Sequence, residues 1–111
     1  MSAKELLEQI VGKANGNEAV KKDLTGFNKV FQFKVSDSSP FYVAIENGSV
    51  SLKDGETPSP STTISGTDAV LSDMFSGKLD SIKAFMSGQI KVSGDVFSAQ
   101  KLTGVISKLR A

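Results

Sequence analysis

The fold of this chain is decided by residues 84–102, which read AFMSGQIKVSGDVFSAQKL. Between Gly88 and Gly94, apolar and polar residues alternate, which predicts a short strand. After Gly94 the apolar residues recur at helical spacing, and Asp95 is a residue type that commonly caps a helix N-terminus. The stretch therefore predicts the end of one helix, a strand and the start of another helix, with a glycine at each change.

The N-terminal residues predict a helix over residues 2–15, because apolar residues recur there at helical spacing. Ser2 and Glu5 have the spacing of a capping box, which satisfies two free N–H groups at a helix start. Gly16 follows the helix. Residues 18–24 then predict either a second, shorter helix or a continuation of the first that bends at Gly16.

Alternation of apolar and polar residues predicts strands further along the chain, over residues 28–36, 41–46, 49–53 and 61–65. Asn47-Gly48 is a strong hairpin signal, because a type I′ turn needs positive φ at both central positions. In the first strand, Phe31 and Phe33 face one side of the sheet and Gln32 faces the other.

Two more helices are predicted before the opening stretch. One starts near Thr67 and ends at Gly77. The next is capped by Asp80 and has a single apolar face, made of Ile82, Phe85 and Met86. Strands and helices are partly segregated along the chain, so we expect an α+β fold in which helices cover one five-stranded sheet. Its length predicts a single domain over residues 1–111.

Composition narrows the chemistry available to this chain. It has no cysteine and no histidine, which removes thiolate chemistry, the usual zinc ligands and the usual general base. A net charge of +1 gives little long-range attraction for nucleic acid or for an anionic membrane. The aspartates occur mainly at predicted turns and helix caps, namely Asp37, Asp54, Asp68, Asp80 and Asp95. We therefore expect no enzyme activity, no metal site, no cofactor and no nucleic-acid partner. The alternative is an enzyme that uses carboxylates alone, which would need two perturbed carboxyl groups that converge in one cleft.

The late helices are rich in phenylalanine and methionine, and the chain has 7 Phe and 3 Met. Such residues fill an ordinary core, and they also line pockets that accept ligands of varied shape. Both arrangements turn the same helix faces inward. Periodicity alone therefore leaves a filled core and an apolar pocket equally compatible with the sequence.

Residues 76–95, SGKLDSIKAFMSGQIKVSGD, resemble the signature of the sterol carrier protein 2 family, also called the sterol-binding domain family. The resemblance continues through Ala99, Lys101 and Leu102 in the helix that follows. Residues 30–33 and 41–48 resemble the family's first strands more loosely.

This resemblance implies a five-stranded mixed sheet covered by helices, with an apolar tunnel between them. It also implies non-catalytic binding and transfer of lipids, which would be fatty acids, fatty acyl-CoA, phospholipids or sterols. Carried over by position, the residues that would bind lipid are Phe75, Leu79, Phe85, Met86, Ile90, Val96, Phe97, Leu102 and Ile106. Phe97 departs from the family pattern, in which a smaller residue is common, so we expect its bulk to narrow or close the tunnel.

The predicted partners follow from the same resemblance. We expect a monomer that takes a lipid ligand and touches membranes transiently. Lys78, Lys91 and Lys101 are candidates for meeting a carboxylate or phosphate headgroup, although solvation explains them more simply. The alternative is a structural or protein-interaction domain of the same fold with a filled core.

Location is predicted from the last residues. Peroxisomal members of the family end in Ser-Lys-Leu, and here Ser107-Lys108-Leu109 is followed by two further residues. That signal is read only at a free C-terminus. We therefore expect a cytoplasmic location, with a peroxisomal one as the alternative.

Overall fold

The computed structural model of the chain describes residues 1–110. Its helices and strands are, in order, α1 (Ala3–Asn15), α2 (Glu18–Leu24), β1 (Lys29–Val35), β2 (Phe41–Glu46), β3 (Ser49–Asp54), β4 (Thr62–Gly66), α3 (Asp68–Ser76), α4 (Ser81–Met86), β5 (Lys91–Gly94) and α5 (Val96–Arg110). α1 and α2 are two separate helices, because Gly16 ends α1 by donating its N–H to the last carbonyls of that helix. Asn17 then caps α2.

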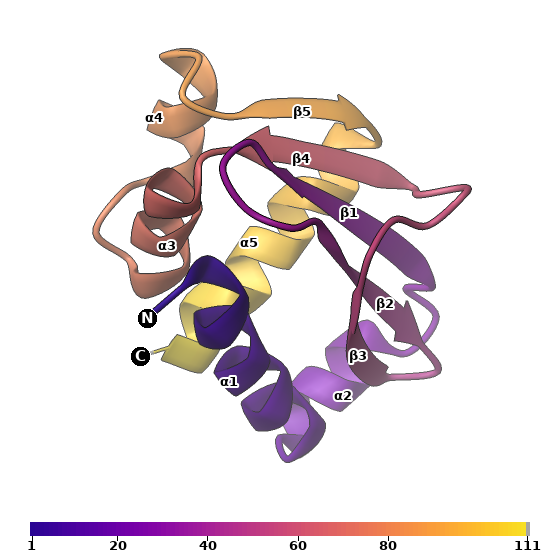
Figure 1. Cartoon of the computed structure of the whole chain (residues 1–111). Coiled ribbons are helices and arrows are strands. Elements are labelled where there is room, and N and C mark those ends of the chain that lie inside the picture. Colours follow the sequence, from indigo (N-terminus) through magenta and orange to yellow (C-terminus); the bar gives the residue numbers. More distant parts are fainter. Residues whose placement is uncertain (111) are drawn as a thin grey trace.

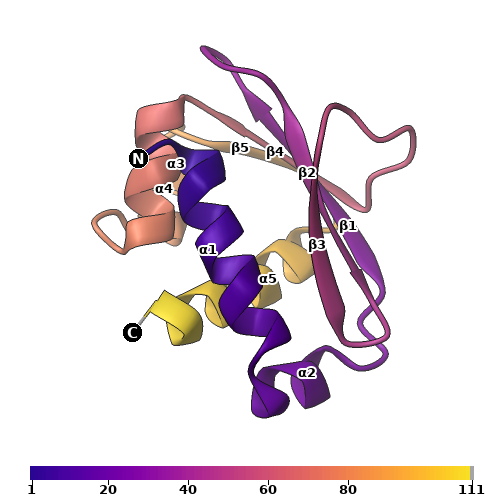
Figure 2. The same ribbon diagram turned by 60° about the horizontal axis from the view of Figure 1, so that its bottom comes forward.

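The strands form one five-stranded mixed sheet in the order β3-β2-β1-β4-β5. β1 and β4 are parallel, and every other neighbouring pair is antiparallel. The helices gather on one side of this sheet, and α5 runs diagonally across it (Figures 1 and 2). The predicted α+β architecture is confirmed. A crossing connection between β3 and β4 brings β4 beside β1.

The core lies between the sheet and the helices, and strand alternation decides which residues enter it. Phe33 of β1 is opposite Phe41 of β2 and Ile64 of β4 on the inner face. Its ring stacks on Phe41 at a centroid distance of 5.2 Å and meets the edge of Phe75 from α3 at 5.6 Å. Leu7 of α1 is fully buried and belongs to the same core cluster as these aromatic rings. The sheet and helices therefore share one aromatic interior.

Gln32 faces the outer side of the sheet, as predicted, but it is only 1% exposed. The loop between β3 and β4 crosses the outer face of β1 and β2 and covers it (Figure 1). The side-chain NH₂ of Gln32 donates to the backbone carbonyls of Phe41 and Gly55, each at 3.1 Å. The side-chain oxygen of Gln32 accepts from the Thr57 N–H at 2.8 Å. A buried amide with these partners is satisfied. Gln32 therefore fixes the crossing loop.

α4 differs from its prediction. The expected apolar face of Ile82, Phe85 and Met86 does not turn into the core, and the one buried residue of the helix is Ala84. α4 has only six residues and lies at one edge of the molecule, next to the start of β5 (Figure 1). Its large apolar side chains consequently lie at the surface.

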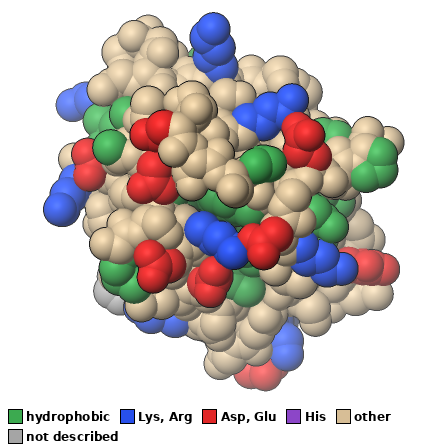
Figure 3. Space-filling model, in the orientation of Figure 1, with side chains coloured by type: hydrophobic (Ala, Val, Ile, Leu, Met, Phe, Trp, Pro, Cys, Tyr) green, Lys and Arg blue, Asp and Glu red, His purple; other side chains and the backbone are tan. Residues whose placement is uncertain are grey.

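Charge is distributed evenly over the face seen in Figure 3, where acidic and basic side chains are interspersed. Lys4, for example, forms an ion pair with Asp54 of β3 and another with Glu8 one turn along α1. Within residues 1–110, no helix combines the length and the hydropathy that crossing a bilayer would need.

Candidate functional site

A cavity of about 560 Å³ lies between β4, β5 and the three late helices. Its size is within the range of small-molecule sites, roughly 300–1,000 Å³. The lining residues are Ile64, Met74, Phe75, Gly77, Leu79, Asp80, Ser81, Ile82, Phe85, Ile90, Val92, Val96, Ala99, Gln100, Thr103, Gly104, Ile106, Ser107 and Arg110.

α5 forms one wall of this cavity along its whole length. Lining residues recur along α5 every three or four positions, from Val96 in the first turn to Arg110 in the last. Residues at this spacing share one helix face. α5 has 15 residues, so this wall is about 22 Å long at a rise of about 1.5 Å per residue. The cavity is therefore an elongated groove.

The opposite walls are apolar. Ile64 and Val92 are paired across β4 and β5 and both line the cavity. Ile90, just before β5, and Phe75 of α3 complete this wall. The Ile90 side chain also packs against Gly66. A Cβ at residue 66 would lie only 3.2 Å from a methyl group of Ile90, so glycine leaves the Ile90 side chain just enough room.

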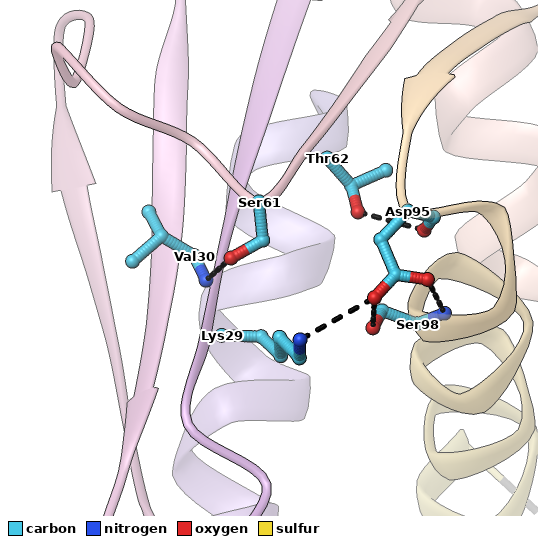
Figure 4. Close-up of polar contacts among 6 residues, drawn as sticks. All are labelled: Lys29, Val30, Ser61, Thr62, Asp95 and Ser98. Carbon is cyan, nitrogen blue, oxygen red and sulfur yellow. Dashed lines mark hydrogen bonds and ion pairs between the residues drawn. The ribbon is translucent and has the colours of Figure 1, made fainter.

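Asp95 fixes the start of α5, and with it one end of the groove (Figure 4). Its carboxylate accepts from the Ser98 hydroxyl at 2.6 Å and from the Ser98 N–H at 3.1 Å, and lies 3.3 Å from Lys29 Nζ. Its own carbonyl accepts from the Thr62 hydroxyl of β4. The bonds from Ser98 and, after them, the Lys29 charge hold the pKa of the Asp95 carboxyl below its ordinary value of 3.8.

Gly94 allows this approach of α5 to β4. Its φ is +88°, and a Cβ there would lie 2.5 Å from the carbonyl oxygen of Ser61. Only glycine adopts such a conformation in so tight a contact without strain. The next residue, Asp95, donates its N–H to that same Ser61 carbonyl at 3.0 Å. The glycine predicted to mark the change from strand to helix therefore also sets where α5 begins.

The structure brings most of the predicted site residues together. Those that line the cavity are Phe75, Leu79, Phe85, Ile90, Val96 and Ile106. Three others do not line it. Leu102 is buried on another face of α5, while Met86 and Phe97 are 80% and 82% exposed. Phe97 therefore does not narrow or close the cavity, contrary to the expectation from its bulk, because its side chain points to solvent from the first turn of α5.

Several lining residues carried no signal in the sequence. On α5 they are small or polar, namely Gln100, Thr103, Gly104 and Ser107. They form a stripe beside the apolar one, and we expect such a stripe to face solvent unless a cavity is already known. Arg110, in the last turn of α5, also lines the cavity, although its place in the sequence indicates only a cation that suits a helix C-terminus. The three lysines considered as headgroup contacts, Lys78, Lys91 and Lys101, are absent from the lining.

The polar part of the lining offers little for catalysis. Asp80 is the one carboxylate among the lining residues, and it accepts the Ile82 N–H at 2.8 Å as the cap of α4. Arg110 is the one cation there. Acid–base chemistry with carboxylates alone needs two groups that converge. The groove instead presents mainly apolar surface along its length.

A second hollow, of about 470 Å³, lies beside the start of α1. Six of its nine lining residues are serine, lysine or aspartate, and they include the Lys4–Asp54 ion pair. It has none of the continuous apolar lining of the groove along α5. We therefore take the groove as the candidate site.

Comparison with known proteins places the chain in a family. The model of the SCP-2 sterol transfer family matches residues 1–107. A curated relative, hydroxysteroid dehydrogenase-like protein 2 of Xenopus tropicalis, is 30% identical over 98 residues. That alignment covers 86% of this chain and 23% of the relative, so the chain spans less than a quarter of that protein's length.

Solved structures share the fold. The sterol carrier protein domain 2 of Helicoverpa armigera matches with a TM-score of 0.76 and 23% identity. The match covers 96% of this chain and 86% of that one. Sterol carrier protein 2 of Aedes aegypti, in complex with palmitate, has a TM-score of 0.70 and 15% identity, and the match covers 94% and 93%. The family model and these folds agree over nearly the whole chain, which therefore belongs to the SCP-2 sterol transfer family.

Proposed function

We propose that this chain binds the acyl chain of a lipid in the groove along α5 and carries it between membranes. The observation that carries the proposal is the elongated cavity of about 560 Å³, walled by Ile64, Phe75, Ile90 and Val92. A filled core, as the alternative of a structural or protein-interaction domain requires, would leave no such space. Membership of a sterol transfer family supports the same conclusion.

Apolar contact supplies the affinity. Each buried methylene contributes about 0.8 kcal/mol, so a sixteen-carbon chain gains on the order of 10 kcal/mol before costs. Association and the ordering of the chain offset much of this gain. We expect a dissociation constant of about one micromolar or tighter.

A long-chain fatty acid is the ligand that we favour, with fatty acyl-CoA, phospholipids and sterols as further candidates. The Aedes aegypti relative was solved with palmitate, a straight sixteen-carbon chain. An extended chain suits a groove whose α5 wall is about 22 Å long. Binding would be non-catalytic, because the lining of the groove holds a single carboxylate and the chain has no histidine or cysteine.

The membrane-facing surface is the mouth of the groove. Ile82 and Phe85 line the cavity and are also exposed, which places them at its opening. Met86 on α4 and Phe97 on α5 add apolar side chains that are each at least 80% exposed. Met86 and Phe97 are the sequence neighbours of the lining residues Phe85 and Val96. Large exposed apolar side chains that border a groove in this way are typical of a surface that meets a membrane or partner.

The charge of residues 77–94 favours an anionic bilayer as the membrane that this surface contacts. Residues 77–94 contain Lys78, Lys83 and Lys91 against one aspartate, which is Asp80. All three lysines are exposed, and none forms an ion pair with an acid in the part of the chain that the structure describes. Lysines beside exposed apolar groups attract anionic lipid headgroups.

The ligand proposal is tested by native mass spectrometry of the purified chain and by displacement of a fluorescent fatty acid. We expect one lipid per chain and saturable displacement by palmitate. Absence of both a bound lipid and saturable binding would contradict the proposal.

The membrane proposal is tested by sedimentation with vesicles of phosphatidylcholine alone or mixed with phosphatidylserine. We expect binding to the anionic vesicles that weakens with salt, and a clear loss in the double variant Met86→Ser, Phe97→Ser. Lys83→Ser should weaken it more than Lys22→Ser, a matched exposed lysine on α2. Equal binding by all variants would rule out this surface.

A further inference from the structure

We propose that Arg110 is the headgroup anchor of the groove: its guanidinium binds the oxyanion of a bound lipid, the carboxylate of a fatty acid or the phosphate of a phosphorylated one. The inference deepens the proposed function and rests on it. It assigns the polar end of the ligand to the last turn of α5, and the acyl chain to the apolar walls that follow toward Val96.

The position of Arg110 within the groove is the first argument. Arg110 is the only cation among the lining residues, and it lies at one extreme of the α5 wall. Leu79 and the apolar residues of the sheet line the same groove. An amphiphile has one charged end and one long apolar part, so a groove with a single cation at one end matches its distribution of polarity.

The backbone beneath Arg110 is shaped to receive its guanidinium. Gly77 ends α3 with a φ of +86°, and a Cβ at this position would lie 2.6 Å from Arg110 Nε. Any side chain at residue 77 would therefore displace the guanidinium. Arg110 also donates from Nη1 to the Met74 carbonyl and from Nη2 to the Ser107 hydroxyl, both at 3.4 Å. These contacts hold the group beside the cavity.

The same contacts leave Arg110 available to a ligand. Both hydrogen bonds are long, at 3.4 Å, and a guanidinium has five N–H donors. Arg110 forms no ion pair with any acid among residues 1–110. A planar guanidinium with free donors binds a carboxylate or a phosphate through two parallel hydrogen bonds.

The other charged groups near the groove do not compete for this role. Asp80 is the one acid on the lining, and one of its oxygens accepts the Ile82 N–H as the cap of α4. Lys101, which the sequence suggested as a headgroup contact, lies 5.0 Å from the centroid of the Phe27 ring. Lys78 and Lys91 lie outside the lining. Arg110 is therefore the residue that would make the groove prefer an anionic amphiphile.

The experiment compares three ligands that share one chain: hexadecanoic acid, hexadecanol and hexadecyl phosphate, each displacing a fluorescent fatty acid. We expect the wild-type chain to bind the acid, the phosphate or both about tenfold or more tightly than the alcohol, since a charged hydrogen bond contributes that much. The Arg110→Met variant should lose this preference and keep its affinity for the alcohol. Arg110→Lys should retain part of it. The tighter of the two anions identifies the headgroup.

Lys108→Met is the matched control, because Lys108 is an exposed cation in the same turn that pairs with Asp23 and is absent from the lining. It should leave the preference unchanged. Equal binding of acid, phosphate and alcohol by the wild type would overturn the assignment of Arg110 while leaving lipid binding intact. An equal loss of all three ligands in Arg110→Met would also overturn it, since that result indicates a structural role. No binding of any ligand by the wild type would reject the proposed function and this assignment with it.

Discussion

The two halves of this molecule share one sheet and differ in how the helices fill it. In the packed half, α1 and α2 cover β1, β2 and β3, and Phe31, Phe41, Leu7 and Leu24 are at most 1% exposed. In the hollow half, α3, α4 and α5 cover β4 and β5 and line the half-open groove of about 560 Å³. Both halves follow the same alternation of apolar and polar residues in their strands.

The difference arises from side-chain size on the helices. α1 presents Leu7 and Ile10 to the interior, and these fill the space above the sheet. On α5 the stripe that faces the cavity contains Ala99, Thr103 and Gly104, which are too small to reach the opposite wall. A ligand site can therefore be made by small residues on one helix, without any change to the sheet.

The largest expected effect is on the packed half. Phe31 is fully buried at the centre of β1, opposite Val43 of β2. Phe31→Ala removes a close-packed ring and leaves a void, which typically lowers the free energy of unfolding by about 3–5 kcal/mol. Urea unfolding followed by circular dichroism measures this change. A loss under about 1 kcal/mol would show that this half is not tightly packed.

A smaller effect is expected at the junction of the two halves, where Lys29 of β1 meets Asp95 at the start of α5. Because the folded-state pKa of Asp95 is lowered, its contribution to stability is present above the ordinary value of 3.8 and is lost as the pH falls through the lower folded-state value. Asp95→Asn should therefore flatten the decline of stability below pH 4. Urea midpoints at pH 6 and pH 3 test this, and an unchanged decline in the variant would contradict it.

The smallest effect is expected from a phenylalanine of the hollow half. Phe97 is 82% exposed, so Phe97→Ala removes almost no packing and should change the free energy of unfolding by less than about 0.5 kcal/mol. The pair of variants, Phe31→Ala and Phe97→Ala, compares the same substitution in the two halves. Similar losses from both would mean that Phe97 packs against the protein, and the membrane-facing surface would then lose its largest side chain.

The sequence predicted the elements of this fold well, because strands, turns and caps depend on local patterns. Asp80 and Asp95 cap helices as expected, and Asn47-Gly48 forms the hairpin turn. Burial of Gln32 was missed, since it depends on a loop that crosses the sheet from a distant part of the chain.

The site was predicted less completely. Apolar periodicity places Phe75 and Ile106 inward but does not say whether space remains between them. Apolar periodicity also predicted that Met86 faces inward. In the structure Met86 is exposed, because α4 has only six residues and buries only Ala84. Arg110 lines the groove because Gly77, 33 residues earlier, makes room for it. Contacts of that kind leave no local pattern in a sequence.

The most direct test of the account is to fill the groove without disturbing the rest of the protein. Gly104 lies on the cavity face of α5, and a Cβ there meets nothing within 4 Å; the same is true of Gly12 on α1, which is outside the lining. Both glycines lie within helices, so Leu at either position should raise helix stability by the same small amount, about 0.8 kcal/mol.

We therefore propose to titrate both variants with a fluorescent fatty acid. Gly104→Leu should occlude the groove and Gly12→Leu should leave it open, while both variants gain the same helix propensity. The account predicts that Gly104→Leu weakens binding about tenfold or more, equivalent to about 1.4 kcal/mol, while Gly12→Leu binds like the wild type. Wild-type affinity in Gly104→Leu, with the fold intact, would show that the ligand binds somewhere other than the groove along α5.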